Sequence, residues 1–170
     1  MIRIGKIAAT HGLQGGLVLT HIVGDGKWLK KGTALLLEIN KGSRIPFFVA
    51  GFRIADNETI VITLEEVPTV TEAKRLVSKT VFVDEKLLAG YVDDTPLLWI
   101  GFKVKDRKLG VLGHIEDVFM TGTQWLAKLT IQDTEVLIPL VEQTVKKVDV
   151  RQKFIETLLP DGLLEVYLEK

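Results

Sequence analysis

The chain has 170 residues, of which 46% are hydrophobic and 26% charged, and its 22 basic and 22 acidic side chains cancel. This composition excludes an intrinsically disordered chain, which needs low hydrophobicity and high net charge. The absence of cysteine excludes disulfides, thiolate metal sites and a cysteine nucleophile.

The charge is distributed unevenly, but only mildly. Residues 1–88 have a net charge of +3 and residues 89–170 have −3. An autonomous nucleic-acid binder has a strongly basic face, so any RNA contact is expected to be local or to follow binding to a protein. The N-terminus has no apolar stretch long enough for a signal peptide, and no segment has the ~18–20 apolar residues of a transmembrane helix. We therefore expect a cytoplasmic protein without a membrane partner.

Short apolar runs rich in Val, Ile, Leu and Phe, broken by turn-forming residues, dominate the first half and are typical of strands. One helix interrupts them, because Thr69 and Glu72 have the spacing of a capping box and Val70, Ala73 and Leu76 recur at helical spacing. Six strands with one short helix predict a closed antiparallel barrel. The expected strands are residues 2–9, 17–23, 33–40, 45–54, 59–65 and 80–84.

The stretch 89–97 is the predicted linker, because it contains Gly90, Pro96 and two aspartates and has poor periodicity. It separates a domain of residues 1–88 from one of residues 98–170, so the predicted fold is all-β, with two small β-barrels in tandem. The end of the chain, 161–168, is either a last strand or a helical turn. The strands expected in the second domain are residues 99–105, 109–119, 124–131, 135–139, 146–150 and 153–158.

No catalytic or metal-binding constellation is evident. His11, His21 and His114 lack the spacing that places two ligands on one helix face. Ser43 and Ser78 are the only serines, and neither lies in a nucleophile elbow. Adjacent carboxylates on a strand point to opposite faces, so their adjacency does not indicate an acid–base pair. We expect a protein that is not an enzyme and that uses no metal and no cofactor.

The glycine-rich stretch 11–16 has two interpretations. Such loops can hold phosphate with backbone amides, but a phosphate site needs the loop to open a helix, and this one leads into a strand. A structural hairpin loop is the favoured interpretation. The same hairpin loop is also a possible docking surface, in which His11 and Gln14 are candidate partner contacts.

Large apolar side chains near the start of the second domain are the main candidates for partner binding. Trp99 and Leu98 can serve either packing or partner contact, and both alternatives remain open. Phe119 and Met120 end a predicted strand at a turn, where exposed apolar residues indicate a partner surface. The cations Lys103, Lys105 and Arg107 either contact RNA phosphate or form a solvated strand edge.

Short segments of both halves follow the pattern of one family, in that family's order. In the first half they are residues 4–7, 11–16, 63–67 and 71–76, and in the second residues 100–104, 109–110, 115–118, 136–141, 145–149 and 158–165. With these segments the chain resembles the RimM ribosome-maturation factors over nearly its whole length.

The resemblance implies a six-stranded N-terminal barrel of the translation-factor type followed by a PRC-barrel. It also implies a non-catalytic role in maturing the small ribosomal subunit, including the processing and folding of its rRNA. The implied partner is the ribosomal protein numbered nineteen, in the head of that subunit. We expect a monomer that holds this protein and adjacent rRNA in an assembly-competent state.

The chain departs from the family at one place. The family often carries a Tyr-Tyr pair before an Asp-Leu-Ile/Met-Gly segment that is tied to ribosome association. Here residues 94–101 read DTPLLWIG, with Trp99 in the position of the family's leucine. Tyr91, a few residues upstream, is therefore added to the candidate contacts.

Two other classes of protein remain as alternatives. Barrels of the N-terminal type also occur in flavin- or nucleotide-binding enzymes, for which a yellow purified protein would be the sign. PRC-barrels also occur as subunits of photosynthetic reaction centres, a role that usually brings a membrane anchor.

Overall fold

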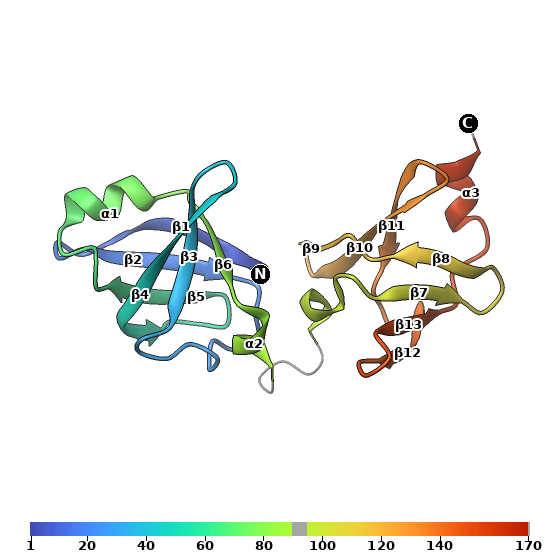
Figure 1. Ribbon diagram of the computed structural model, residues 1–170, viewed down its shortest axis with the longest axis horizontal. Helices are drawn as coiled ribbons and strands as arrows, with labels where there is room; N and C mark the ends of the chain where they lie inside the picture. Colours follow the sequence, from blue (N-terminus) through green and yellow to red (C-terminus); the bar gives the residue numbers. More distant parts are fainter. Residues whose placement is uncertain (90–94, 170) are drawn as a thin grey trace. The chain divides into compact units, whose positions relative to one another are not determined.

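The computed structural model describes residues 1–89 and 95–169 and divides into two compact units, Met1–Asp94 and Thr95–Lys170. Figure 1 shows the helices and strands of each unit. Most of the predicted linker, including Tyr91, lies outside the described residues.

Six antiparallel strands close into a barrel in the first unit, in the order β1-β2-β5-β4-β3-β6. The barrel closes because β6 pairs with both β1 and β3, which leaves no open sheet edge. This confirms the barrel predicted from the apolar runs. The strands are β1 (Ile2–His11), β2 (Gly16–His21), β3 (Ala34–Asn40), β4 (Ser43–Ile54), β5 (Thr59–Leu64) and β6 (Thr80–Val83).

Two short helices accompany the barrel. α1 (Val70–Leu76) buries Ala73 and Leu76. Its capping box is half formed: Thr69 Oγ1 accepts from the Glu72 amide at 3.3 Å, but the Glu72 carboxylate accepts from the Thr69 hydroxyl. α2 (Glu85–Leu88) begins after Asp84, whose carboxylate accepts from the Lys86 amide at 2.9 Å.

A buried histidine lies at the end of β2. His21 is 2% exposed and stacks edge-on against Trp28, with ring centroids 5.8 Å apart. His21 Nδ1 accepts from the Val23 amide at 3.2 Å, and the indole of Trp28 donates to the Val23 carbonyl at 3.0 Å. Burial lowers the pKa of His21, and nearby Asp56 only partly opposes this. The folded barrel therefore favours the neutral imidazole, whose Nδ1 can act as an acceptor.

We expect the barrel to lose stability as the pH falls below the ordinary histidine pKa of about 6.5. The folded pKa of His21 is lowered, so the unfolded chain binds the proton first, and stability is complete only above that value. In His21→Asn the amide oxygen can accept from Val23 without titrating. Urea unfolding between pH 5.5 and 7.5 should show a smaller pH dependence for this variant, and equal dependence in both proteins would contradict the explanation.

The second unit consists of two sheets. A four-stranded sheet has the order β12-β13-β7-β8, in which β13 and β7 are parallel, and a three-stranded sheet has the order β11-β10-β9. The short 3-10 helix η1 (Pro96–Trp99) precedes them. The other elements are β7 (Lys103–Asp106), β8 (Gly110–His114), β9 (Asp117–Thr121), β10 (Gln124–Ile131), β11 (Thr134–Pro139), β12 (Val145–Asp149), β13 (Phe154–Thr157) and α3 (Leu163–Leu168).

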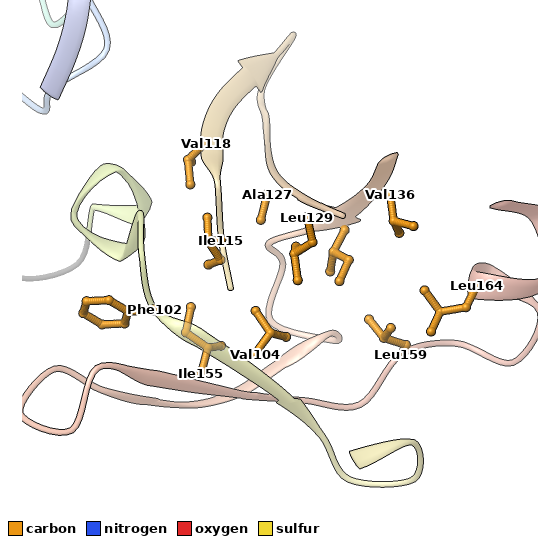
Figure 2. Close-up of a cluster of buried hydrophobic side chains, with 11 residues drawn as sticks. Phe102, Val104, Ile115, Val118, Ala127, Leu129, Val136, Ile155, Leu159 and Leu164 are labelled. Atoms are coloured by element: carbon orange, nitrogen blue, oxygen red, sulfur yellow. The ribbon is translucent and has the colours of Figure 1, made fainter. Parts of the chain in front are cut away.

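The core of the second unit lies between its two sheets (Figure 2). Val104 and Ile155 contribute from the four-stranded sheet, and Ala127, Leu129 and Val136 from the three-stranded sheet. Inward residues alternate with outward ones along each strand, so each sheet presents a second face on the side away from this core. Leu159 and Leu164 complete one end of the cluster.

Two predicted strands of the second unit were wrong. The strand expected at 99–105 begins only at Lys103, because Pro96 starts a 3-10 helix in the segment before it. The strand expected at 109–119 is two strands, β8 and β9, which belong to different sheets. The chain changes sheets between them: the Ile115 amide donates to Phe102 at 2.9 Å, while the Glu116 amide donates to Lys128 of β10 at 2.8 Å.

The end of the second unit is helical. Of the two alternatives for 161–168, the structure shows helix α3, which follows Gly162 and buries Leu164. Every helix within residues 1–89 and 95–169 is too short or too polar to cross a bilayer.

Candidate partner-binding surfaces

The outer face of the three-stranded sheet is apolar. Phe119, Leu126 and Pro139 lie directly across from one another on neighbouring strands. They alternate with the buried residues Val118, Ala127 and Ile138, so they point away from the core. Leu137 faces outward by the same alternation. We call Phe119, Leu126, Leu137 and Pro139 the apolar face; all four are partly exposed.

An ion pair borders the apolar face. Lys128 lies opposite Leu137 and Asp117, and its Nζ is 3.1 Å from the Glu135 carboxylate. That carboxylate raises the pKa of Lys128. An apolar centre with a charged rim is the usual arrangement of a protein–protein interface.

The structure separates the apolar residues predicted as partner contacts. Met120 pairs with Trp125, whose side chain packs against the core, so alternation turns Met120 to the side opposite Phe119. Trp99 is partly buried and packs against the same core. Its indole nitrogen is buried, and no acceptor for it is found in the described part of the chain. Leu98 is partly exposed in η1, which lies against β9.

The predicted cations lie on the other sheet. Lys103 and Lys105 alternate with buried Val104 and Asp106 on β7, so they occupy the outer face of the four-stranded sheet. Arg107 follows the strand, and its guanidinium forms an ion pair with Glu156.

An open hollow on this sheet contains residues that the sequence patterns did not mark as partner contacts. Phe154 pairs with Lys103 through the parallel β13–β7 ladder, and His114 pairs with Lys103 from β8. The backbone amide of Lys103 donates to the Lys153 carbonyl at 3.0 Å, which fixes Lys153 beside it. We call the surface formed by Lys103, Lys105, His114, Lys153 and Phe154 the basic hollow.

His11 and Gln14 lie in the first unit, where both are exposed at the hairpin between β1 and β2. The pairing of His11 with Gly16 confirms the hairpin interpretation of the glycine-rich stretch. Within residues 1–89 and 95–169, no group of three or more His, Asp or Glu side chains is arranged to hold a metal ion.

Comparison with known families agrees with this division into two units. The model of the RimM N-terminal domain matches residues 2–88, and the model of the RimM PRC barrel domain matches residues 99–163. The chain belongs to the RimM family. The first match covers the closed barrel, and the second covers both sheets of the second unit.

Relatives named ribosome maturation factor RimM align with this chain over nearly the whole length of both proteins. The chain is 32% identical to a ribosome maturation factor RimM of Parabacteroides distasonis, over 98% of this chain and 96% of the relative. It is 26% identical to the ribosome maturation factor RimM of Flavobacterium psychrophilum, over 97% and 95%. A crystal structure described as a 16S ribosomal RNA processing protein RimM from Pseudomonas aeruginosa aligns over 94% of this chain and 97% of that one, with 19% identity and a TM-score of 0.45.

Proposed function

We propose that this chain is a non-catalytic assembly factor for the small ribosomal subunit that binds the head ribosomal protein numbered nineteen. Membership of the RimM family and the names of the full-length relatives support a role in ribosome maturation. The proposal includes assistance to rRNA processing and folding, by a cytoplasmic monomer that makes and breaks no covalent bond.

The apolar face is the surface that we propose for binding the ribosomal protein. Phe119, Leu126 and Pro139 form a row across all three strands, and each of them is partly exposed. Aromatic anchors surrounded by aliphatic contacts supply much of the affinity of protein interfaces. Leu98 of η1, which is partly exposed and lies beside β9, extends the proposed surface.

Binding through the apolar face suggests a mechanism in which no covalent bond is made or broken. The apolar face holds the ribosomal protein in the conformation that it needs in the subunit head, and release follows when the mature contacts replace it. Trp99 packs against the core beneath this face, and Met120 is turned to the side opposite Phe119. His11, Gln14 and Tyr91 are secondary candidate contacts.

Replacing Phe119 with aspartate is expected to weaken retention of immature small subunits by about tenfold or more, because a carboxylate in the apolar row would be buried on binding. The measurement is a pull-down of immature and mature small subunits with the immobilised chain. Val166→Asp is the matched control, since Val166 is an exposed apolar residue of the same unit, in α3, that lies outside the apolar face.

Two outcomes would contradict the proposal. One is equal retention of immature and mature particles by the unaltered chain, or retention of neither. The other is equal weakening by Phe119→Asp and Val166→Asp. Urea unfolding of both variants shows whether a loss of retention reflects loss of fold.

A further inference from the structure

The basic hollow is built from strands that are distant in sequence. The parallel ladder places Phe154 of β13 beside Lys103 of β7, and Glu156 beside Lys105. On the other side of β7, His114 and Val111 of β8 lie opposite the same two lysines. An aromatic ring and several cations are therefore held on one rigid sheet face.

The positive charge of the hollow is largely unneutralised. Its one acidic lining residue, Glu156, is engaged by Arg107 from outside the hollow. Lys103, Lys105 and Lys153 have no carboxylate within ion-pair distance anywhere in the described ranges 1–89 and 95–169. A surface with this charge attracts a polyanion.

The aromatic ring of Phe154, which lies among the lysines of the hollow, indicates which kind of polyanion the hollow binds. Lys147 Nζ lies over the Phe154 ring, 5.7 Å from its centroid, so a bound base has to share or displace this cation at the ring face. Proteins that bind single-stranded nucleic acid combine a positive groove along the backbone with aromatic rings on which bases stack. The two-residue spacing of Lys103 and Lys105 along the strand, about 7 Å, is close to the separation of neighbouring phosphates in an extended nucleotide chain.

We propose that the basic hollow binds a single-stranded RNA segment, with Lys103, Lys105 and Lys153 on its phosphates and a base stacked on Phe154. The identification of this RNA as rRNA of the small subunit rests on the proposed function. Lysines are point charges without a fixed fork of donors, so this site is expected to tolerate many sequences. Because the apolar face lies on the other side of the core, one unit can hold protein and RNA together.

The test uses the full chain and a fluorescein-labelled oligouridine of about 12 nucleotides, with binding followed by fluorescence anisotropy. Lys103→Ala/Lys105→Ala is expected to bind at least tenfold more weakly. The slope of log affinity against log salt should become shallower by about 1.4, because the variant neutralises two fewer phosphates of the single strand. The matched control, Lys74→Ala/Lys86→Ala, removes two exposed lysines of the first unit and should bind as the unaltered chain does.

A second variant tests the stacked base. Phe154→Leu keeps an apolar side chain of similar size but removes the ring, and it is expected to weaken oligouridine binding by roughly fivefold or more. Polyglutamate serves as a polyanion without bases. If polyglutamate competes equally well and Phe154→Leu has no effect, the site binds an acidic protein segment and the RNA proposal is overturned.

The outcomes separate this proposal from the assembly role. If the unaltered chain does not bind oligouridine, or if the control variant loses binding as much as Lys103→Ala/Lys105→Ala, the hollow is not an RNA site, whatever the pull-down shows. If oligouridine binding depends on Lys103, Lys105 and Phe154 while no small subunit is retained, the RNA site stands and the assembly role fails.

Discussion

Asp106→Ala is expected to lower the free energy of unfolding of the second unit by about 3 kcal/mol. Asp106 is 2% exposed, and its carboxylate accepts four hydrogen bonds from two other segments of the chain. Oδ1 accepts from the amides of Lys108 and Leu109 in the β7–β8 turn, at 2.9 and 3.1 Å. Oδ2 accepts from the Thr157 hydroxyl at 3.1 Å and the Leu159 amide at 2.8 Å. Without the carboxylate, the buried donors of Thr157 and Leu159 lose their acceptor, which is the main cost.

Asp161→Ala is the control for this variant. Asp161 pairs with Lys108 at 3.1 Å, but its side chain is 91% exposed, so its removal should change stability by less than about 1 kcal/mol. Hydrogen exchange read by mass spectrometry resolves the two units separately. Equal protection of second-unit amides in both variants would count against the assigned role of Asp106.

Asp106 also predicts how the second unit responds to acid. Burial by itself would raise the pKa of Asp106, but the hydrogen bonds from Leu159, Lys108, Leu109 and Thr157 outweigh it and hold the pKa below the ordinary value of 3.8. The stability that this lowered pKa contributes is present above that value and is lost as the pH falls through the folded pKa. Asp106→Ala should therefore flatten the acid limb of the stability curve.

Gly15→Ala is expected to destabilise the first unit by about 3–5 kcal/mol, for two separate reasons. Gly15 has a φ of +78°, which disfavours any side chain, and a Cβ at this position would overlap the carbonyl oxygen of Val67. That carbonyl belongs to the segment that leads into α1, so neither backbone can move without disturbing the other.

Gly12→Ala separates the two causes. Gly12 is in the same hairpin loop with a φ of +69°, but its Cβ would meet open space. It should therefore cost only the left-handed backbone penalty of about 1–2 kcal/mol. Urea unfolding of both variants gives the comparison, and equal losses would show that overlap with Val67 is not the reason for a glycine at position 15.

The strands of the first unit were predicted better than those of the second, because residues next to each strand in the sequence mark where it ends. Each apolar run of the barrel is bounded by turn residues, so its strands can be delimited without knowing how they pair. The run 109–119 has no such boundary: β8 continues into β9 through Ile115, a core residue, and a change of sheet leaves no mark in an apolar pattern.

The candidate surfaces were predicted only in part, for the same reason. Alternation on β7 placed Lys103 and Lys105 on one face, but Phe154 and Lys153 join them through pairing between distant segments. Phe119 and Met120 are neighbours at a turn, and their position alone predicts one surface for both. On a strand, however, neighbours face opposite sides, so only Phe119 belongs to the apolar face.

The parallel pairing of β7 with β13 also sets an order for folding during synthesis. The first barrel has all its strands once β6 has emerged from the ribosome, since β1 pairs with β6. The four-stranded sheet stays incomplete until β13 has been translated, because its central strand β7 has to wait for that neighbour. The nascent chain thus carries a finished barrel well before it has a basic hollow, and any binding of RNA through that surface has to wait until β13 has paired with β7.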